Sequence, residues 1–294
     1  MSKIKAYLQL IRFPAVFTAL ADIFAGYLTA FGAEIVSSDL LLLLFASSQV
    51  YWAGMVFNDY FDYYTDLRER PKRPLPSGAI SRNSALCLGI AFSLLSITAA
   101  GIVGLNSLLI AIILVIVVIL YDWLTKGIPA ISVFNMGLCR GLNIALGMSI
   151  AEKALIFHKL PVALILMAYI IFVTQLSKGE VEGSNRIRVI ITIAGVSVLT
   201  VILNGLSLFN FFENKISTLI LSVVFLLFVM PSLVRAAKKP VAQNISGAVK
   251  NCLLGIIILD GCFIAGAVGI IFAILIALSL LIPAILTSRL MYIT

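Results

Sequence analysis

Long apolar runs separated by short polar connections make up almost the whole sequence. The runs cover residues 13–33, 40–58, 84–104, 107–125, 129–150, 160–177, 187–209, 216–236, 246–265 and 267–288. Most are close to the ~20 residues that a helix needs to cross the hydrocarbon core of a bilayer. The alternating segments typical of a membrane β-barrel are absent from the sequence. The pattern therefore predicts an all-α fold, a polytopic membrane helix bundle with nine core transmembrane helices and a tenth at the C-terminal end.

The composition supports this interpretation. Of the 294 residues, 62% are hydrophobic and 12% are charged, and the mean hydropathy is +1.13. Charged residues make up about 25% of an ordinary soluble domain. No linker or soluble segment interrupts the runs, so we expect residues 1–294 to form a single transmembrane domain. The last two runs are compatible with a hairpin or with one broken helix.

Basic residues are distributed unevenly between the two sets of connections. If the N-terminus lies inside, the outer connections contain only Lys153, Lys159 and Lys215, and nearly all other lysines and arginines fall in the inner ones. Cytoplasmic loops carry such an excess. We therefore expect a multi-pass protein, in a bacterial plasma membrane, with its N-terminus on the cytoplasmic side. The net charge of +8 follows from this bias and from attraction to membrane lipid, so no nucleic acid partner is expected.

The stretch "NDYFDYYTD" (58–66) places acidic side chains where the second run meets the inner surface. At ~100° per residue, Asn58, Asp62 and Asp66 lie at about 0°, 40° and 80° around a helix, and Asp59 lies at about 100°, so all four are expected to share one face. Carboxylates on one face repel each other unless a cation neutralises them. Mg²⁺ prefers oxygen ligands, so the pattern predicts a magnesium site.

A second interpretation of this stretch needs no metal. Four basic residues follow directly, and the acids could pair with them in a solvated cluster at the membrane surface. These residues are Arg68, Arg70, Lys72 and Arg73.

The segment "SKGEVEGSNR" (177–186) forms a second acidic site at the inner end of the sixth run. Glu180 and Glu182 would point ~200° apart on a regular helix, so both can face one ion only if the helix has ended. Gly179 and Gly183 favour such an end. The alternative is a solvated loop in which the acids balance Lys178 and the arginines that follow.

Arg140 is the only basic residue expected deep within a membrane span. Ionisable groups at that depth face a cavity or a partner. Arg140 could therefore line a binding pocket, or it could form a buried pair with Asp22 or Asp260. Lys126 ends the fourth run on the inner side, after Tyr121 and Asp122.

Two acidic sites, a basic loop and an apolar bundle together suggest a substrate with a diphosphate head and a hydrophobic tail. Metal ions that bridge the acids and the diphosphate would stabilise the leaving group, and arginine and lysine would neutralise the remaining charge. Ionisation would leave an allylic cation in a cavity sheltered from water.

These motifs resemble the UbiA superfamily of intramembrane prenyltransferases over nearly the whole chain. Asn58-Asp59-x-x-Asp62-x-x-x-Asp66 matches the first aspartate-rich motif of that family, "RPKRPLPSGAIS" (70–81) is similar to the segment after it, and "LIRFP" resembles the start of its first helix. The resemblance implies nine helices around a central cavity that opens sideways to lipid. It also implies an acceptor bound against helices one, two and five.

The chain departs from the family pattern at three places. The second motif retains Glu182 and Gly183, has Glu180 in place of an aspartate, and has serines, Ser177 and Ser184, in place of its outer acids. Thr125 stands where the usual Tyr-x-x-x-Lys pattern has its lysine, and Lys126 follows one position later. A tenth apolar run exceeds the usual nine. These features resemble the divergent UbiA-like EboC branch.

On this basis we expect a Mg²⁺-dependent transferase that moves an isoprenoid group from a polyprenyl diphosphate to a small hydrophobic or aromatic acceptor. A terpene cyclase and a non-catalytic prenyl-lipid binding or transport protein remain alternatives. The expected catalytic residues are Asp62, Asp66 and Arg140. The expected metal ligands are Asn58, Asp59, Asp62, Asp66, Glu180 and Glu182. The expected diphosphate-binding residues are Arg68, Arg70, Lys72, Arg73, Lys126 and Lys178.

Overall fold

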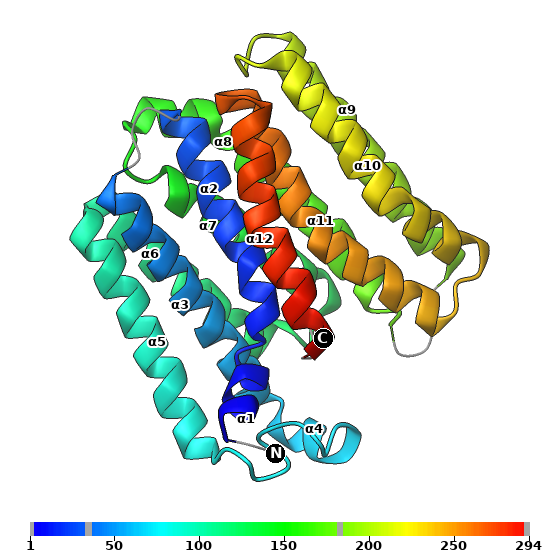
Figure 1. The fold of residues 1–294 in the computed structure, drawn as a ribbon. Helices are drawn as coiled ribbons and strands as arrows, with labels where there is room; N and C mark the ends of the chain where they lie inside the picture. The colour runs from blue at the N-terminus through cyan, green and yellow to red at the C-terminus, as the bar shows by residue number, and fades with distance from the viewer. Residues whose placement is uncertain (1–2, 33–36, 181–184, 291–294) are drawn as a thin grey trace.

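The computed structural model describes residues 3–32, 37–180 and 185–290, and helices are the only regular structure in these ranges (Figure 1). The helices in chain order are α1 (Lys3–Leu10), η1 (Phe13–Ala15), α2 (Val16–Phe31), α3 (Ser38–Phe61), α4 (Tyr63–Glu69), α5 (Arg82–Val103), α6 (Leu105–Leu120), η2 (Tyr121–Thr125), α7 (Pro129–Met148), α8 (Lys153–Ser177), α9 (Arg186–Leu208), α10 (Lys215–Lys238), α11 (Ala242–Val268) and α12 (Ile270–Leu290). The all-α fold predicted from the sequence is confirmed.

Ten helical segments in the described part of the chain are long and apolar enough to cross a membrane, and each coincides with one predicted run. The last two runs are separate helices, α11 and α12, that form a hairpin (Figure 1). Gly269 joins them with a φ of 96°, a backbone conformation that favours glycine. The largest difference is in α8, which starts at Lys153 and includes Pro161. The protein is therefore an integral, multi-pass membrane protein.

Five of the long helices, α2, α3, α7, α8 and α11, form the centre of the bundle. α5 and α6 pack outside α3 and α7, whereas α9 and α10 pack outside α8 and α11 (Figure 1). α12 lies against α2, η1 and α11. Helices that are distant in the sequence therefore pack together at the centre of the bundle.

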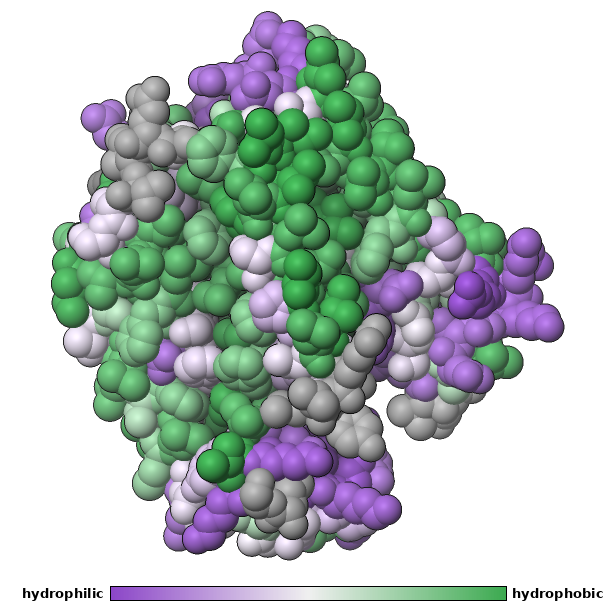
Figure 2. Space-filling model, viewed as in Figure 1, coloured by the Kyte–Doolittle hydropathy of each residue, from purple (hydrophilic) through white to green (hydrophobic). Residues whose placement is uncertain are grey.

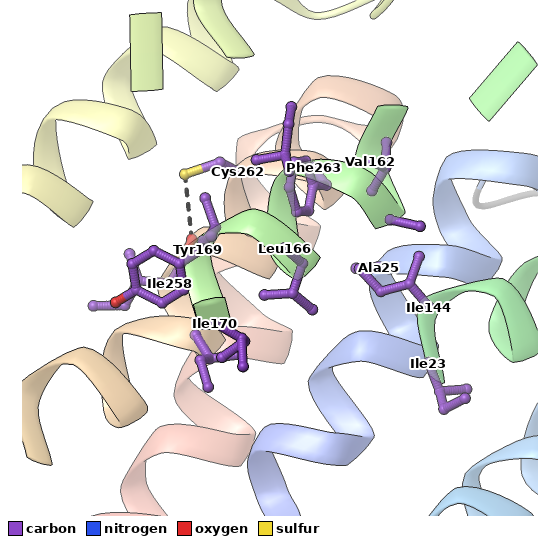
Figure 3. Packing of buried hydrophobic residues seen from close by; sticks show 14 of the residues in the cluster. Ile23, Ala25, Ile144, Val162, Leu166, Tyr169, Ile170, Ile258, Cys262 and Phe263 are labelled. Atoms are coloured by element: carbon purple, nitrogen blue, oxygen red, sulfur yellow. Dashed lines mark hydrogen bonds between the residues drawn. The ribbon is translucent and has the colours of Figure 1, made fainter. Parts of the chain in front are cut away.

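Large buried side chains fill the part of the bundle where α8 meets α11. Figure 3 shows Tyr169, Ile170 and Phe263 among them. The hydroxyl of Tyr169 donates a hydrogen bond of 2.8 Å to the carbonyl oxygen of Cys252, which satisfies its polar atom inside the bundle.

The outer surface matches a lipid environment. Figure 2 shows a broad hydrophobic band with hydrophilic side chains gathered at the ends of the helices. α12 is the least buried candidate span, with 17% of its most apolar window buried. Its many exposed apolar side chains, including Leu275 and Leu278, are accounted for by contact with acyl chains.

α2 and α7 approach each other unusually closely because a glycine of each helix lies at the crossing. A Cβ atom on Gly26 would lie 2.2 Å from the carbonyl oxygen of Ile144, and one on Gly147 would lie 2.6 Å from that of Ile23. Small residues at such crossings let membrane helices pack backbone against backbone. This contact fixes the distance between α2 and α7 and therefore the position of the polar residues that they carry.

We predict that Gly147→Ala lowers the thermal midpoint of the purified protein, with a loss of about 1–3 kcal/mol, because the new methyl group meets backbone atoms that cannot rotate away. Gly205→Ala in α9 is the matched control, since a Cβ atom there meets nothing within 4 Å. The midpoint is measured in detergent by intrinsic fluorescence. Equal midpoints for Gly147→Ala and Gly205→Ala would contradict the close-contact interpretation.

Candidate functional site

A cavity of about 870 Å³ lies between the central helices, at the end of the bundle that carries the acidic stretch 58–66. The distribution of basic residues predicts that this end faces the cytoplasm, and it is therefore called the inner end or inner surface. From α3 it is lined by Tyr51, Met55 and Asn58, at the spacing of one helical stripe, and Asp62 continues that stripe. Tyr51 lies seven residues before Asn58, which is ~10 Å deeper along the helix axis. The wall changes from aromatic and apolar to acidic toward the inner surface.

The wall formed by α8 and the residues just after it also changes from apolar to polar toward the inner end. Ile170 and Val173 line the deeper part, and Thr174, Ser177 and Glu180 line the part nearer the inner surface. α11 adds an apolar wall that consists of Val249, Leu253, Leu254 and Ile256. The cavity therefore combines an ionic inner end with an apolar interior.

The acidic stretch 58–66 does not form one uninterrupted helix. α3 ends at Phe61, and Asp62 stands between α3 and α4. Helical hydrogen bonds nevertheless continue across this joint, from the amide of Asp62 to the carbonyl of Asn58 (3.0 Å) and from the amide of Asp66 to the carbonyl of Asp62 (2.9 Å). The i, i+4, i+8 spacing therefore keeps the side chains of Asn58, Asp62 and Asp66 on the cavity wall. The expectation that they share one face is confirmed.

Asp59 is the exception, because its side chain is buried behind this face and does not line the cavity. Its carboxylate accepts hydrogen bonds of 3.3 Å from both Arg12 and Arg73. Asp59 was expected among the metal ligands, yet the structure gives it two guanidinium partners instead. Helical spacing put Asp59 on the same face, about 20° from Asp66, so neither its place behind that face nor its pairing with distant Arg12 could be predicted from the sequence.

Basic side chains hold the acids that do line the cavity. Lys126 Nζ pairs with Asp62 and donates a 3.1 Å hydrogen bond to Asn58 Oδ1. Arg73 donates a 2.7 Å bond to Asp66, and Arg70 lies 3.9 Å from the same carboxyl group. The acids are thus paired with cations, as the second interpretation expected, but in the wall of a cavity and not in a solvated cluster. The magnesium site of the first interpretation stays a prediction.

A π-helical turn, η2, brings Lys126 into this cluster. The amide of Lys126 bonds to the carbonyl of Tyr121 over five positions, at 3.1 Å, in place of the four of an α-helix. Compared with the Tyr-x-x-x-Lys pattern, this chain has one more residue between Tyr121 and its lysine, and the wider π-turn accommodates that residue. Tyr121 and Lys126 consequently both line the cavity, as an α-helical Tyr-x-x-x-Lys pattern would allow.

The second acidic site contributes Glu180. α8 ends at Ser177, as Gly179 led us to expect, and Glu180 lines the cavity just beyond it. Its Oε1 atom is buried and has no hydrogen-bond partner among the described residues. Burial raises the pKa of this carboxyl group, and the charge of Arg70 lowers it to a smaller extent. Glu182 lies outside the described residues.

Arg140 both pairs with an acid and lines the cavity. Its guanidinium donates 2.8 Å bonds to Asp22 and to the carbonyl of Thr18. Asn143 donates a 2.9 Å bond to the other Asp22 oxygen. Asp260 is the neighbouring buried acid, but the ion pair is formed with Asp22. Arg140 lies ~16 Å along α7 from Pro129, at the deep end of the cavity.

Several predicted site residues do not reach the cavity. Arg68 and Lys72 are exposed, and Lys178 instead donates hydrogen bonds to the carbonyl of Pro129 (2.6 Å) and to Ser132 (3.2 Å). Conversely, the sequence analysis assigned no site role to some residues that line it. These are chiefly Arg12, Tyr51, Glu69 and Asp122.

The cavity offers the donor set that a hard divalent cation requires. Oxygen atoms face one space from four side chains, Asn58, Asp62, Asp66 and Glu180. The Oε1 atom of Glu180, which has no hydrogen-bond partner among the described residues, is free to bind a metal ion. Within the described ranges, no three acidic, histidine or cysteine side chains already converge on one point. A cation would therefore enter only as Lys126 and Arg73 move off the carboxylates.

Comparison with known proteins agrees with this geometry. The model of the UbiA prenyltransferase family matches residues 19–234, which is more than half of the chain. The chain belongs to this family. The resemblance inferred from the motifs is thus confirmed, whereas its assignment to the EboC-like branch stays a prediction.

Among curated relatives, the digeranylgeranylglyceryl phosphate synthase of Sulfurisphaera tokodaii is 32% identical over 118 residues, which cover 40% of this chain and 42% of that protein. The chain spans less than half of the length of the first curated relatives that it matches.

Solved UbiA structures show the same fold. A UbiA homologue from Aeropyrum pernix K1 superposes with a TM-score of 0.70 at 14% identity, over 85% of this chain and 97% of that one. A homologue from Archaeoglobus fulgidus bound to GPP and Mg²⁺ gives a TM-score of 0.57 at 18% identity, over 94% and 99% of the two chains.

We predict that Arg140→Gln lowers the free energy of unfolding by about 3 kcal/mol, because it leaves the buried Asp22 without its cation. The double variant Arg140→Gln/Asp22→Asn should recover more than half of this loss, since both charges are then absent. Arg188→Gln, at an exposed position in α9, is the control. Thermal midpoints of the wild type, Arg140→Gln, Asp22→Asn and the double variant form a double-mutant cycle, and strictly additive effects would refute the pairing.

Proposed function

We propose that this protein is a Mg²⁺-dependent prenyltransferase that moves an isoprenoid group from a polyprenyl diphosphate to a hydroxyl group of an acceptor carrying glyceryl phosphate. The observation that carries the proposal is a cavity in which an ionic inner end continues into an apolar interior. A molecule with a diphosphate head and an isoprenoid tail has this same division. Family membership and the GPP and Mg²⁺ bound by the Archaeoglobus fulgidus homologue support the donor and the metal.

The residues at the inner end divide into two roles. Asn58, Asp62, Asp66 and Glu180 would hold magnesium, which when bound supplies positive charge to the diphosphate oxygens. Lys126, Arg70 and Arg73 would transfer from the carboxylates to the diphosphate. In this exchange the carboxylates would gain magnesium as the basic side chains leave them, so neither set of charges loses its partners. It also gives the internal ion pairs a role in keeping the acids in position before the donor binds.

The apolar interior would protect the reactive carbon. Val249, Leu253 and Leu254 of α11 and Ile170 of α8 offer no nucleophile to an allylic cation. Water excluded by these side chains cannot compete with the acceptor. The isoprenoid tail would occupy this part of the cavity.

The acceptor is inferred from the names of the relatives and from two further arginines in the cavity wall, Arg12 and Arg140. The relatives are named digeranylgeranylglyceryl phosphate synthase. Arg12 and Arg140 also line the cavity, where they pair with Asp59 and Asp22, and could bind a second phosphate group. An aromatic acceptor, which the sequence analysis favoured, stays an untested alternative.

The test is transfer by the purified protein in lipid vesicles. With geranylgeranyl diphosphate, Mg²⁺ and geranylgeranylglyceryl phosphate, we expect a doubly prenylated glyceryl phosphate and one diphosphate released per product. Asp62→Asn should reduce the rate by about 10²-fold or more, because one anionic oxygen ligand is lost. Asp39→Asn, at the opposite end of α3, should retain the wild-type rate.

Parallel reactions decide between acceptors. Prenylation of a hydroxybenzoate in place of the glyceryl phosphate would replace the proposed acceptor with an aromatic one. A cyclic hydrocarbon formed without acceptor would indicate a cyclase. Absence of Mg²⁺-dependent diphosphate release with every acceptor would refute the transferase proposal.

A further inference from the structure

Five carboxyl groups line the cavity, and their partners differ. Asp62 and Asp66 are held by Lys126, Arg73 and Arg70. Glu69 is exposed at the end of α4. Glu180 has been assigned to the metal above. The remaining carboxyl group belongs to Asp122 and is used by none of these interactions.

Asp122 combines burial with the absence of a partner. Only 6% of the residue is exposed, and within the described part of the chain its carboxyl group forms no hydrogen bond and no ion pair. Acids inside a bundle are normally paired, because an unpaired buried charge is costly. An acid left without a partner on a cavity wall is therefore a candidate for chemistry with the bound molecules.

The π-turn places Asp122 at the ionic end of the cavity. Asp122 is the second residue of η2, between Tyr121 and Lys126, and all three line the cavity. The groups with the largest electrostatic effect on its carboxyl group are Lys126, Asp62, Arg12 and Asp59. Asp122 thus lies among the charged groups that would bind the diphosphate head, and the reacting carbon of the donor is bonded to that head.

The reaction has a proton to dispose of at this place. When the acceptor oxygen bonds to the allylic carbon, the carbon–oxygen bond of the donor breaks, and its electron pair stays on the diphosphate. The acceptor hydroxyl must then lose its proton. An acceptor attacked at a ring carbon would lose a proton as well, so the need does not depend on the acceptor class.

We propose that Asp122 is the proton-transfer residue of this reaction, an inference that rests on the proposed prenyl transfer. A carboxyl oxygen of Asp122 accepts the hydroxyl proton of the acceptor, and the same residue gives one proton to the departing diphosphate. The products are the prenyl ether and a singly protonated diphosphate. Whichever of the two transfers comes first, Asp122 returns to its starting state and no proton from water is needed.

Asp122→Asn tests the proposal, since the amide has nearly the same shape but cannot exchange a proton in this way. We expect kcat for prenyl transfer to fall by about 10²-fold, while KM for the donor changes by less than about threefold. Asp122→Glu should restore most of the rate. Asp39→Asn is the control for an acid that lies outside the cavity.

A second experiment separates proton transfer from a purely structural role. Asp122→Ala leaves a space in the wall, and added formate should raise its transfer rate several-fold by replacing the lost carboxyl group. Formate should not raise the rate of Asp62→Ala. If Asp122→Asn is too unstable to assay, the formate result on Asp122→Ala decides, and a rate independent of formate overturns the inference.

The outcomes also distinguish this inference from the proposed function. If the wild-type protein shows no Mg²⁺-dependent transfer, the proposed function fails. If the wild type transfers the prenyl group and Asp122→Asn does so within about threefold of that rate, only the role of Asp122 is overturned.

Discussion

The structure depends above all on the cost of placing charge inside an apolar bundle. A carboxylate that leaves water must find a cation or hydrogen-bond donors, or it destabilises the fold. Here Asp59 lies between Arg12 and Arg73, Asp66 is bound by Arg73, and Asp62 is bound by Lys126. Carboxylates that would bind a metal and basic side chains that would bind a diphosphate thus keep each other in place. The ligand-free protein can tolerate an acidic site because the cations for the substrate are already there.

The fold supplies the rigid frame on which this exchange can take place. Gly26 and Gly147 bring α2 and α7 into backbone contact, and the Asp22–Arg140 pair and Asn143 connect the two helices at the same interface. α3 then presents its acidic stripe to the cavity beside them. Because close contact fixes α2 and α7, the exchange of ion-pair partners is expected to need movement of the long basic side chains and not of these two helices.

Much of this could be predicted from the sequence, because its strongest signals are local. Hydrophobic run length gave the ten spans, and helical spacing placed Asn58, Asp62 and Asp66 on one wall. What could not be predicted depends on contacts between distant segments. The pairing of Asp59 with Arg12, 47 positions away, is one such contact. The π-turn is another case, since one extra residue between Tyr121 and Lys126 could equally have turned the lysine out of the cavity.

The most direct test of the central claim is donor binding with and without metal. A non-reactive thio-diphosphate analogue of geranylgeranyl diphosphate is titrated into the protein in lipid nanodiscs by calorimetry. If magnesium and diphosphate replace the internal ion pairs, Mg²⁺ should lower Kd by about 10²-fold, or roughly 2.7 kcal/mol. A Kd that is the same with Mg²⁺ and with excess chelator would contradict the account.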